Sequence, residues 1–303
     1  MSDCRREYWR WRFSLAIFRN CDPMDFIFQR ESGAWNHWRG YRVQLGPRPG
    51  GWISMPIEFQ AACPICIERR TFTSPDDYNS CRDSLVATDC PLNNCVTRER
   101  AAAHVVFSLF SREAFETLRI HESAPGGRGL SLWLWYNSKQ KVFSGYYPDR
   151  SFGSMVEHIR NEDLENQTFP DLSFDLVIHL DVMEHLFDPF AALNEIFRTL
   201  DYGGVCIFTT PTYAERVASE QVAFREAGDI RIVGEPEYHG NPQDPTGSLV
   251  TWRYGYDLPL LIQRRTGFDV EVRRMQSKGI AVLGPMTEVY ILKKPARSYR
   301  PAL

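Results

Sequence analysis

Apolar runs alternate with segments of helical spacing from about residue 98 onwards. Short, nearly continuous apolar runs, typical of strands buried on both faces, lie at 118–121, 141–149, 174–180 and 205–211. Apolar residues at helical spacing occupy 98–118, 130–136, 188–200 and 254–268. Strands that alternate with helices predict an α/β fold with a parallel sheet and right-handed crossovers.

Three stretches add to this pattern. Residues 269–275 and 288–294 are predicted to form an antiparallel hairpin at the sheet edge, and 154–169 a short helix, a brief strand and a polar turn. Residues 212–251 are polar and interrupt the alternation. Long irregular stretches in compact domains are often functional lids, so we expect a lid here.

The segment Leu118–Gly129 predicts a cofactor site, because a strand, an acid and a glycine-rich turn lead into a helix. Such a junction aims backbone N–H groups and a helix N-terminus at one point, which suits an anionic or polyhydroxylated cofactor. Ala124, Gly126 and Gly129 fit an A-x-G-x-x-G spacing. An NAD-dependent oxidoreductase is one alternative, but it needs an acid about 20 positions on, and 141–147 supplies none.

Cysteines gather in residues 59–100, which follow a Trp-, Arg- and Pro-rich stretch at 1–58. The C-x₂-C pair of Cys63 and Cys66 has the spacing of a zinc knuckle. Cys90 is placed to join this pair, and Cys95, Cys81 or His104 could complete four ligands. The candidate ligand set is Cys63, Cys66, Cys90 and Cys95, and a degenerate ribbon that folds without metal is the open alternative.

Composition narrows the class of protein. The chain has 303 residues, 43% of them hydrophobic and 24% charged, as in a globular protein. Its net charge of −3 gives no reason to expect a nucleic-acid partner, and its apolar runs are too short to span a membrane. Residues 1–13 lack a signal-peptide core, so we expect a cytoplasmic protein with reduced cysteines.

The ordered motifs within residues 118–295 resemble class I, Rossmann-like S-adenosylmethionine-dependent methyltransferases of the type 11 group. The run NEDLENQTFPDLSFDLVIHLDVMEHLFDPFAALNEIFRTLDYGGVCIFTTP carries the resemblance. It implies a doubly wound, seven-stranded, mostly parallel sheet. The block CPIC to CVTRERA is similar to a cysteine-containing N-terminal module of some members. The implied domains are a 1–58 extension, a 59–100 zinc-ribbon-like module and a 101–303 methyltransferase domain with a lid at 212–251.

The resemblance implies S-adenosylmethionine as cofactor and assigns its contacts by position. Glu122 and the loop after it would face the methionine part, Asp163 and Leu164 the adenine, and His179–Asp181 the reaction centre. The full set is Glu122, Ser123, Ala124, Gly126, Gly129, Tyr146, Asp163, Leu164, His179 and Asp181. The usual ribose-binding carboxylate is replaced by Gly145 and Tyr146, and Asp149 lies a few residues beyond.

The implied reaction is in-line methyl transfer to an oxygen or nitrogen of a small molecule or sugar. An acceptor hydroxyl or ammonium must lose a proton, and the candidates for taking it are His239, His185 and Asp181. Acceptor contacts are expected from Tyr238, Asn241 and Trp252. Two alternatives stay open: transfer of the aminocarboxypropyl group, and a degenerate methyltransferase fold that serves as a binding module.

Overall fold

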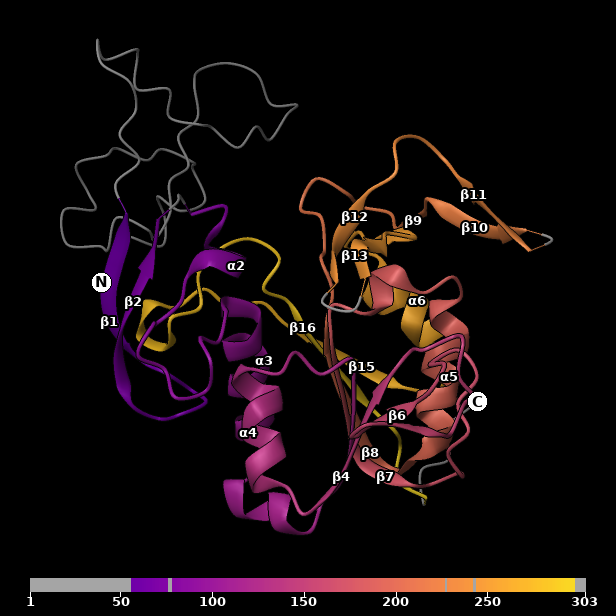
Figure 1. The fold of residues 1–303 in the computed structure, drawn as a ribbon, viewed down its shortest axis with the longest axis horizontal. Helices are drawn as coiled ribbons and strands as arrows, with labels where there is room; N and C mark the ends of the chain where they lie inside the picture. The colour runs from indigo at the N-terminus through magenta and orange to yellow at the C-terminus, as the bar shows by residue number, and fades with distance from the viewer. Residues whose placement is uncertain (1–55, 76–77, 227, 242–243, 298–303) are drawn as a thin grey trace, which may run out of the picture. The chain divides into compact units, whose positions relative to one another are not determined.

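The computed structural model describes residues 56–75, 78–226, 228–241 and 244–297 (Figure 1). The described residues all belong to one compact unit, so the cysteine-containing segment and the α/β segment are part of the same unit. Nearly all of the predicted 1–58 extension lies outside the described residues. In the described part, no helix combines the length and the apolar character needed to cross a membrane.

The described part contains an eight-stranded sheet of order β15-β16-β8-β7-β3-β4-β6-β5. The strands are β3 (Arg119–Ser123), β4 (Gln140–Gly145), β5 (Met155–Val156), β6 (Ile159–Asn161), β7 (Phe174–Leu180), β8 (Leu200–Thr209), β15 (Asp269–Arg273) and β16 (Val289–Lys293). Strands β6, β4, β3, β7 and β8 run parallel, whereas β16, β15 and β5 are antiparallel to their neighbours. The predicted doubly wound, mostly parallel sheet is confirmed, with the two-residue β5 as an added edge strand.

Helices cover both faces of the sheet (Figure 1). Helices α3 (Thr97–Leu109) and α4 (Gly129–Asn137) lie on one face, and α5 (Pro189–Thr199) and α6 (Leu258–Arg265) on the other. Neighbouring strand residues point to opposite faces, so Ile178 joins the core under α3 and α4, and Val177 the core under α5 and α6. This explains why the parallel strands are apolar throughout.

Helix α5 begins where the sequence predicts it. The Asp188 carboxylate accepts hydrogen bonds from the backbone N–H groups of Phe190 and Ala191, and Pro189 occupies the first turn. Strand β8 starts at Leu200, directly after α5, and Gly203 lies inside this strand where its register with β7 shifts.

Two predicted helices differ from the structure. The helix expected over 98–118 ends at Leu109, and a 3₁₀ segment, η2 (Arg112–Glu116), follows. This turn buries Phe115 edge-on against Trp133. The helix expected within 154–169 is wrong. The chain forms β5 and then turns at Glu157, which has a positive φ, into β6 (Ile159–Asn161), which pairs with both β5 and β4.

The 212–251 insertion is more regular than its composition suggests. It forms β9 (Glu220–Gln221), β10 (Ala223–Glu226), β11 (Asp229–Ile232), β12 (Tyr238–Asn241) and β13 (Asp244–Leu249). Two hairpins, β10–β11 and β12–β13, stand out from the sheet, and β9 pairs with β14 (Trp252–Arg253) (Figure 1). The hydroxyl of Thr251 donates to the backbone carbonyls of Glu184 and Leu186, which ties the insertion to the loop after β7.

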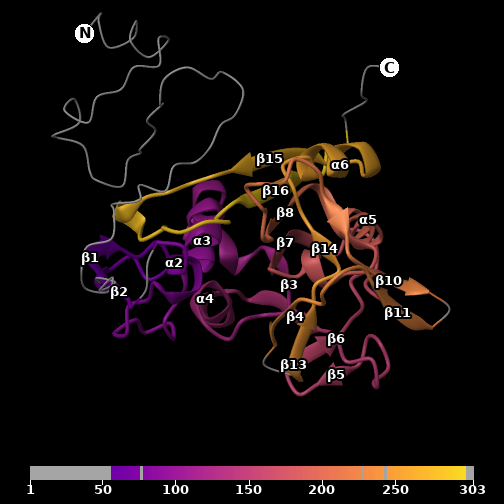
Figure 2. The same ribbon diagram turned by 90° about the horizontal axis from the view of Figure 1, so that it is seen from above.

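The cysteine-containing segment packs directly on α3 (Figure 2). It consists of the hairpin β1 (Ile57–Ala62) and β2 (Arg69–Ser74) and the short helix α2 (Cys81–Ser84). The buried Arg100 guanidinium of α3 donates to the carbonyls of Leu85 and Ala281, and so connects this segment to the turn η4 (Lys278–Ile280). One continuous core therefore joins the cysteine segment to the sheet.

Candidate cofactor and acceptor site

The crevice lies at the carboxyl ends of β3 and β7. The chain leaves β3 for β4 on one side and later returns to β7 on the other side. In an open parallel sheet such a switch point forms a crevice outside the strand ends, where ligands bind. Glu122 and Ser123 end β3, Asp181 follows β7, and Gly145 ends β4.

A short hydrogen-bonded chain holds the glycine loop between β3 and α4. The Ser131 hydroxyl donates to the Glu122 carboxyl group and accepts from the backbone N–H of Gly126, at 3.0 Å. Ala124 has a positive φ of 53°, a conformation that glycine adopts more readily than alanine. Gly129 has no room for a Cβ atom, which would lie 2.4 Å from the Glu99 carboxylate.

The cysteine segment borders this loop directly. The backbone N–H of Gly129 donates to the carbonyl of Leu92 at 2.7 Å, and Arg128 forms an ion pair with the buried Glu99 at 2.7 Å. The loop conformation therefore depends on residues that precede the α/β segment.

Glu122 is the electrostatically unusual group of the loop. Burial raises the pKa of its carboxyl to about 8, against the lowering effect of the Ser131 hydrogen bond. Its Oε2 atom is buried and accepts no hydrogen bond. A cationic ligand group brought to this loop would supply the missing partner.

The end of β4 has no carboxylate. A Cβ atom at Gly145 would lie 3.1 Å from the Tyr147 ring and 3.2 Å from Ile159, so this position is already crowded. Tyr146 is exposed and stacks on Phe152, and Asp149 is also exposed. Tyr147 thus occupies the space that a ribose-binding carboxylate would need.

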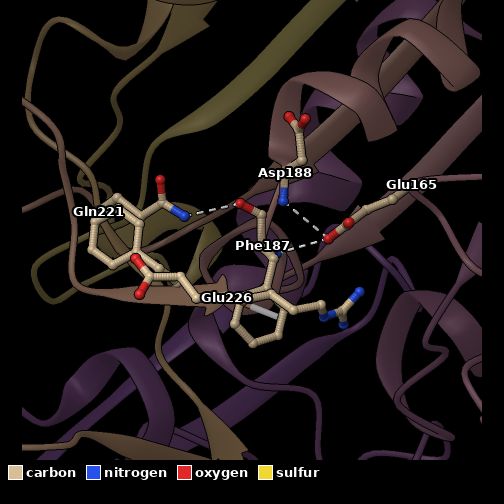
Figure 3. A pocket seen from close by; sticks show the side chains of 7 residues that line it. Glu165, Phe187, Asp188, Gln221 and Glu226 are labelled. Atoms are coloured by element: carbon tan, nitrogen blue, oxygen red, sulfur yellow. Dashed lines mark hydrogen bonds between the residues drawn. The ribbon is translucent and has the colours of Figure 1, made fainter. Parts of the chain in front are cut away.

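The predicted adenine contacts lie in the turn after β6. The Asp163 carboxylate accepts a hydrogen bond from the backbone N–H of Glu165, and Leu164 is buried. Beyond this turn, Figure 3 shows a pocket that contains none of the predicted site residues; it is lined by Glu165, Phe187, Asp188, Gln221, Phe224, Arg225 and Glu226. Glu165 accepts from the backbone N–H groups of Phe187 and Asp188, so its carboxylate joins two loops.

The two predicted residues at the end of β7 are both sequestered. The imidazole of His179 is fully buried, stacks on Phe208 at 4.8 Å, and has its pKa lowered to about 3 by burial. The Asp181 carboxylate forms ion pairs with Arg82 at 2.6 Å and Arg98 at 3.0 Å. Burial pushes the pKa of Asp181 up, but the two arginines outweigh it and hold the pKa below its ordinary value.

The other two predicted catalytic residues meet across the crevice. His185 lies on η3 (Met183–His185) after β7, and His239 lies on β12 of the insertion. Their rings are 5.1 Å apart and nearly perpendicular. Glu184 lies between them, with its Oε1 3.8 Å from His185 Nε2 and 3.7 Å from His239 Nδ1. Sequence reasoning missed Glu184, although the run DVMEH contains it.

The predicted acceptor contacts are dispersed around this cluster. Tyr238 is exposed, and Asn241 donates to the Ser248 hydroxyl across the β12–β13 hairpin. Trp252 packs edge-on against Phe190 and parallel to Tyr254. Trp252 therefore supports the insertion, whereas the ring of Tyr238 is exposed on β12.

The structure brings together three of the four cysteines predicted to bind metal, Cys63, Cys90 and Cys95. The Sγ atoms of Cys63 and Cys95 are 3.8 Å apart. Hydrogen bonding to Cys90 and then to Cys95 raises the pKa of Cys63, while hydrogen bonding to Cys63 and Cys95 lowers the pKa of Cys90. The shifts are opposite because these thiols lie close enough to share hydrogen bonds, and Cys66 follows Cys63 by three residues in the β1–β2 turn.

Comparisons with known proteins agree with this fold. Residues 143–208 match a family model described as a methyltransferase domain. A probable S-adenosylmethionine-dependent methyltransferase of Mycolicibacterium smegmatis is 42% identical over 53 residues, which cover 18% of this chain and 21% of that protein. The match thus spans about a fifth of the relative's length.

Solved structures of methyltransferases are also similar. An S-adenosylmethionine-dependent methyltransferase from Mesorhizobium loti has 16% sequence identity and a TM-score of 0.43, covering 64% of this chain and 97% of that chain. One from Methanosarcina mazei has 15% identity and a TM-score of 0.38, covering 64% and 98%. The family match and the curated relative show that this chain is similar to S-adenosylmethionine-dependent methyltransferases, and its sheet is doubly wound and mostly parallel.

Proposed function

We propose that the chain transfers a methyl group from S-adenosylmethionine to an oxygen or nitrogen atom of a small-molecule or sugar acceptor. The observation that carries the proposal is the coincidence of the family match over 143–208 with a glycine loop and a buried acid at the sheet switch point. When bound, S-adenosylmethionine supplies a methyl group already activated by its sulfonium.

The residues present fit this cofactor at the loop. Glu122 offers a buried carboxyl oxygen without a hydrogen-bond partner, which suits the cationic methionyl end. A Cβ atom at Gly126 would meet no atom closer than 3.6 Å, so the backbone is open to close approach. Asp163 and Leu164 border the adenine side, and the crowded Gly145 leaves the ribose to other contacts.

The acceptor is proposed to bind beside Glu184, His185 and His239. Glu184 raises the pKa of His239 and Glu237 adds to this effect, while burial opposes it. This polar group lies at the crevice edge under the insertion and is where an acceptor hydroxyl or ammonium loses its proton. Tyr238 and Asn241 of β12 are proposed to contact the rest of the acceptor.

Calorimetry with S-adenosylmethionine and S-adenosylhomocysteine tests the proposal. The Gly126→Val variant is expected to weaken binding at least tenfold, or about 1.4 kcal/mol, because its side chain enters the space at the loop. Gly279→Val on η4 is the matched control and should bind like the parent chain. Absence of binding by the parent chain at millimolar ligand would reject the function.

Product analysis separates the remaining alternatives. Methyl transfer leaves S-adenosylhomocysteine, whereas aminocarboxypropyl transfer leaves methylthioadenosine. Tight cofactor binding without turnover on any acceptor would favour a binding module.

A structural zinc ion at Cys63, Cys66, Cys90 and Cys95 is the second part of the proposal. A tetrahedral ion with Zn–S bonds of about 2.3 Å separates two thiolates by about 3.8 Å, which matches the Cys63–Cys95 distance of 3.8 Å. Two thiolates at this distance repel each other, and a bound cation would offset that repulsion.

Zinc content checks this site directly. We expect about one zinc per denatured chain, and loss of that zinc in Cys66→Ser together with a lower melting temperature. Cys206→Ser changes a thiol in the sheet core and should keep the metal. A zinc ratio near zero in the parent chain would instead establish the metal-free ribbon.

A further inference from the structure

Three donor atoms converge between η3 and β12. Among the described residues, Glu184, His185 and His239 form a group whose donor atoms all lie within 4.8 Å of one another. Glu184 is 1% exposed, and its Oε1 atom is buried without a hydrogen-bond partner. Two imidazoles face this buried carboxylate oxygen at 3.7 and 3.8 Å, and a bound cation would complete its contacts.

Each of the three side chains has its other polar atom held by an outer contact. His185 Nδ1 lies 2.8 Å from the carbonyl of Leu249, so it donates there and leaves the Nε2 lone pair toward Glu184. The Oε2 atom of Glu184 accepts from the Thr210 hydroxyl at 2.9 Å. His239 Nε2 lies 3.4 Å from Glu237, which leaves Nδ1 toward Glu184.

The outer carboxylate is itself fixed. Glu237 pairs with Arg253 at 3.0 Å and accepts from the Tyr213 hydroxyl at 3.1 Å. Metal-bound histidines commonly donate their second ring N–H to a carboxylate or a backbone carbonyl, which sets the tautomer and the ring orientation. Both histidines show such an arrangement.

We propose that Glu184, His185 and His239 bind a divalent first-row transition-metal ion at the acceptor side of the crevice. Two imidazoles and one carboxylate are a donor set typical of such ions, with coordination positions left open. Ligand bonds of about 2.0–2.1 Å imply donor separations of about 3.3–3.4 Å on a tetrahedral ion. The separations of 3.7 and 3.8 Å from Glu184 to the two imidazoles need a closure of a few tenths of an ångström. The two imidazole nitrogens, within 4.8 Å of each other, need to approach by up to about 1.5 Å.

The open positions define an acceptor class, an inference that rests on the proposed function. An acceptor hydroxyl bound to the ion loses its proton to solvent near neutral pH, because a divalent ion lowers the pKa of a bound oxygen. The oxygen then bonds to the methyl carbon as the carbon–sulfur bond breaks and leaves its electron pair on sulfur. Acceptors with a second oxygen able to chelate the ion would be preferred.

The rival explanation is a metal-free ion pair between Glu184 and a protonated His239. The charged groups around the cluster are Glu237 and Arg253, with Tyr213 and His185 as further titratable neighbours. A proton on His239 would satisfy one side of Glu184 but would leave the Nε2 lone pair of His185 aimed at a carboxylate.

Titration of the full chain with Co²⁺ tests the site. Co²⁺ at two imidazoles and a carboxylate gives visible d–d absorption without the near-ultraviolet charge-transfer band that thiolate ligands produce, so the cysteine cluster is distinguishable. Glu184→Gln and His239→Gln are expected to weaken this binding at least 100-fold. Glu237→Gln should weaken it by about 10–100-fold through His239, and the exposed His158→Gln is the matched control.

Loss of the thiolate-free absorption in the first two variants, with melting temperatures near the parent value, would support the site. Co²⁺ absorption that shows only thiolate charge transfer, or that Glu184→Gln leaves unchanged, would overturn it in favour of the ion pair. Co²⁺ binding without S-adenosylmethionine binding would keep the metal site and reject the proposed function. Turnover that chelator leaves undiminished would reject the role of the ion in acceptor activation.

Discussion

Replacement of Asp181 by asparagine is expected to lower the free energy of unfolding by about 3–5 kcal/mol. The Asp181 carboxylate pairs with Arg82 at 2.6 Å and Arg98 at 3.0 Å and accepts from the Thr209 hydroxyl at 2.8 Å. Asparagine keeps the shape but removes the less exposed of the two anions that pair with these guanidinium groups, which then keep only the exposed Asp83 carboxylate. Removing one member of such a buried pair is far more destabilising than removing a surface pair.

Chemical denaturation measures this effect. Asp171→Asn is the matched control, because its carboxylate is 71% exposed and pairs with Arg198 at the surface. We expect that control to change stability by less than about 1 kcal/mol. A cycle with Arg82→Gln should show that the effects of the Asp181 and Arg82 substitutions are strongly non-additive.

The Asp181 prediction also decides a functional question. If Asp181 accepts a proton from the acceptor, its substitution should abolish turnover with little change in the free energy of unfolding. If Asp181 instead ties α2 and α3 to the end of β7, its substitution should first lower the stability of the fold. Its lowered pKa also makes it a poor base. Unchanged stability in Asp181→Asn, combined with lost turnover, would return Asp181 to the catalytic group.

Local patterns predicted the elements, but not the contacts between distant segments. The apolar runs placed β7 and β8, and the Asp188–Pro189 start placed α5, because these signals are confined to a few residues. The arginines that pair with Asp181 lie 99 and 83 residues before it in the chain. Neither the hydrophobic periodicity nor the composition of the sequence indicates which distant residues form such ion pairs.

The same limit explains the site around His239. The polar insertion and the DVMEH run each suggested function, and the structure brings His239 and His185 together. Glu184 escaped notice because a carboxylate between two candidate residues has no spacing signal of its own. His179 is the opposite case. Its place at the end of a strand suggested a contact with the cofactor, but the sheet buries its imidazole.

Glu122→Gln is expected to gain stability relative to the parent chain as pH rises. The difference between their free energies of unfolding should change by about 3–5 kcal/mol between pH 4.5 and pH 8. The folded carboxyl has a pKa raised to about 8 from an ordinary value of 4.5. Between these values the folded state keeps a proton that the unfolded state has lost. Parent stability should therefore fall with increasing pH across this window and level off above it.

Urea unfolding at pH 5 and pH 8.5 measures how strongly the free energy of unfolding depends on pH in the variant and in the parent chain. Glutamine loses the titration but keeps a carbonyl oxygen for Ser131, so any packing penalty is the same at both pH values. Glu116→Gln is the control, because Glu116 is exposed and pairs only with Lys139 at the surface. A pH dependence that is identical in Glu122→Gln and the parent would show that Glu122 ionises normally in the fold.

The same titration connects the fold to the cofactor. If the cationic methionyl end of S-adenosylmethionine binds next to Glu122, it favours the ionised carboxylate and lowers the pKa toward its ordinary value. Binding at pH 7 should then release a proton, which calorimetry detects as a binding enthalpy that varies with the ionisation enthalpy of the buffer. Glu122→Gln should bind without this release. Proton release that persists in the variant would assign the linkage to another group, and binding without any release would place the cationic end away from Glu122.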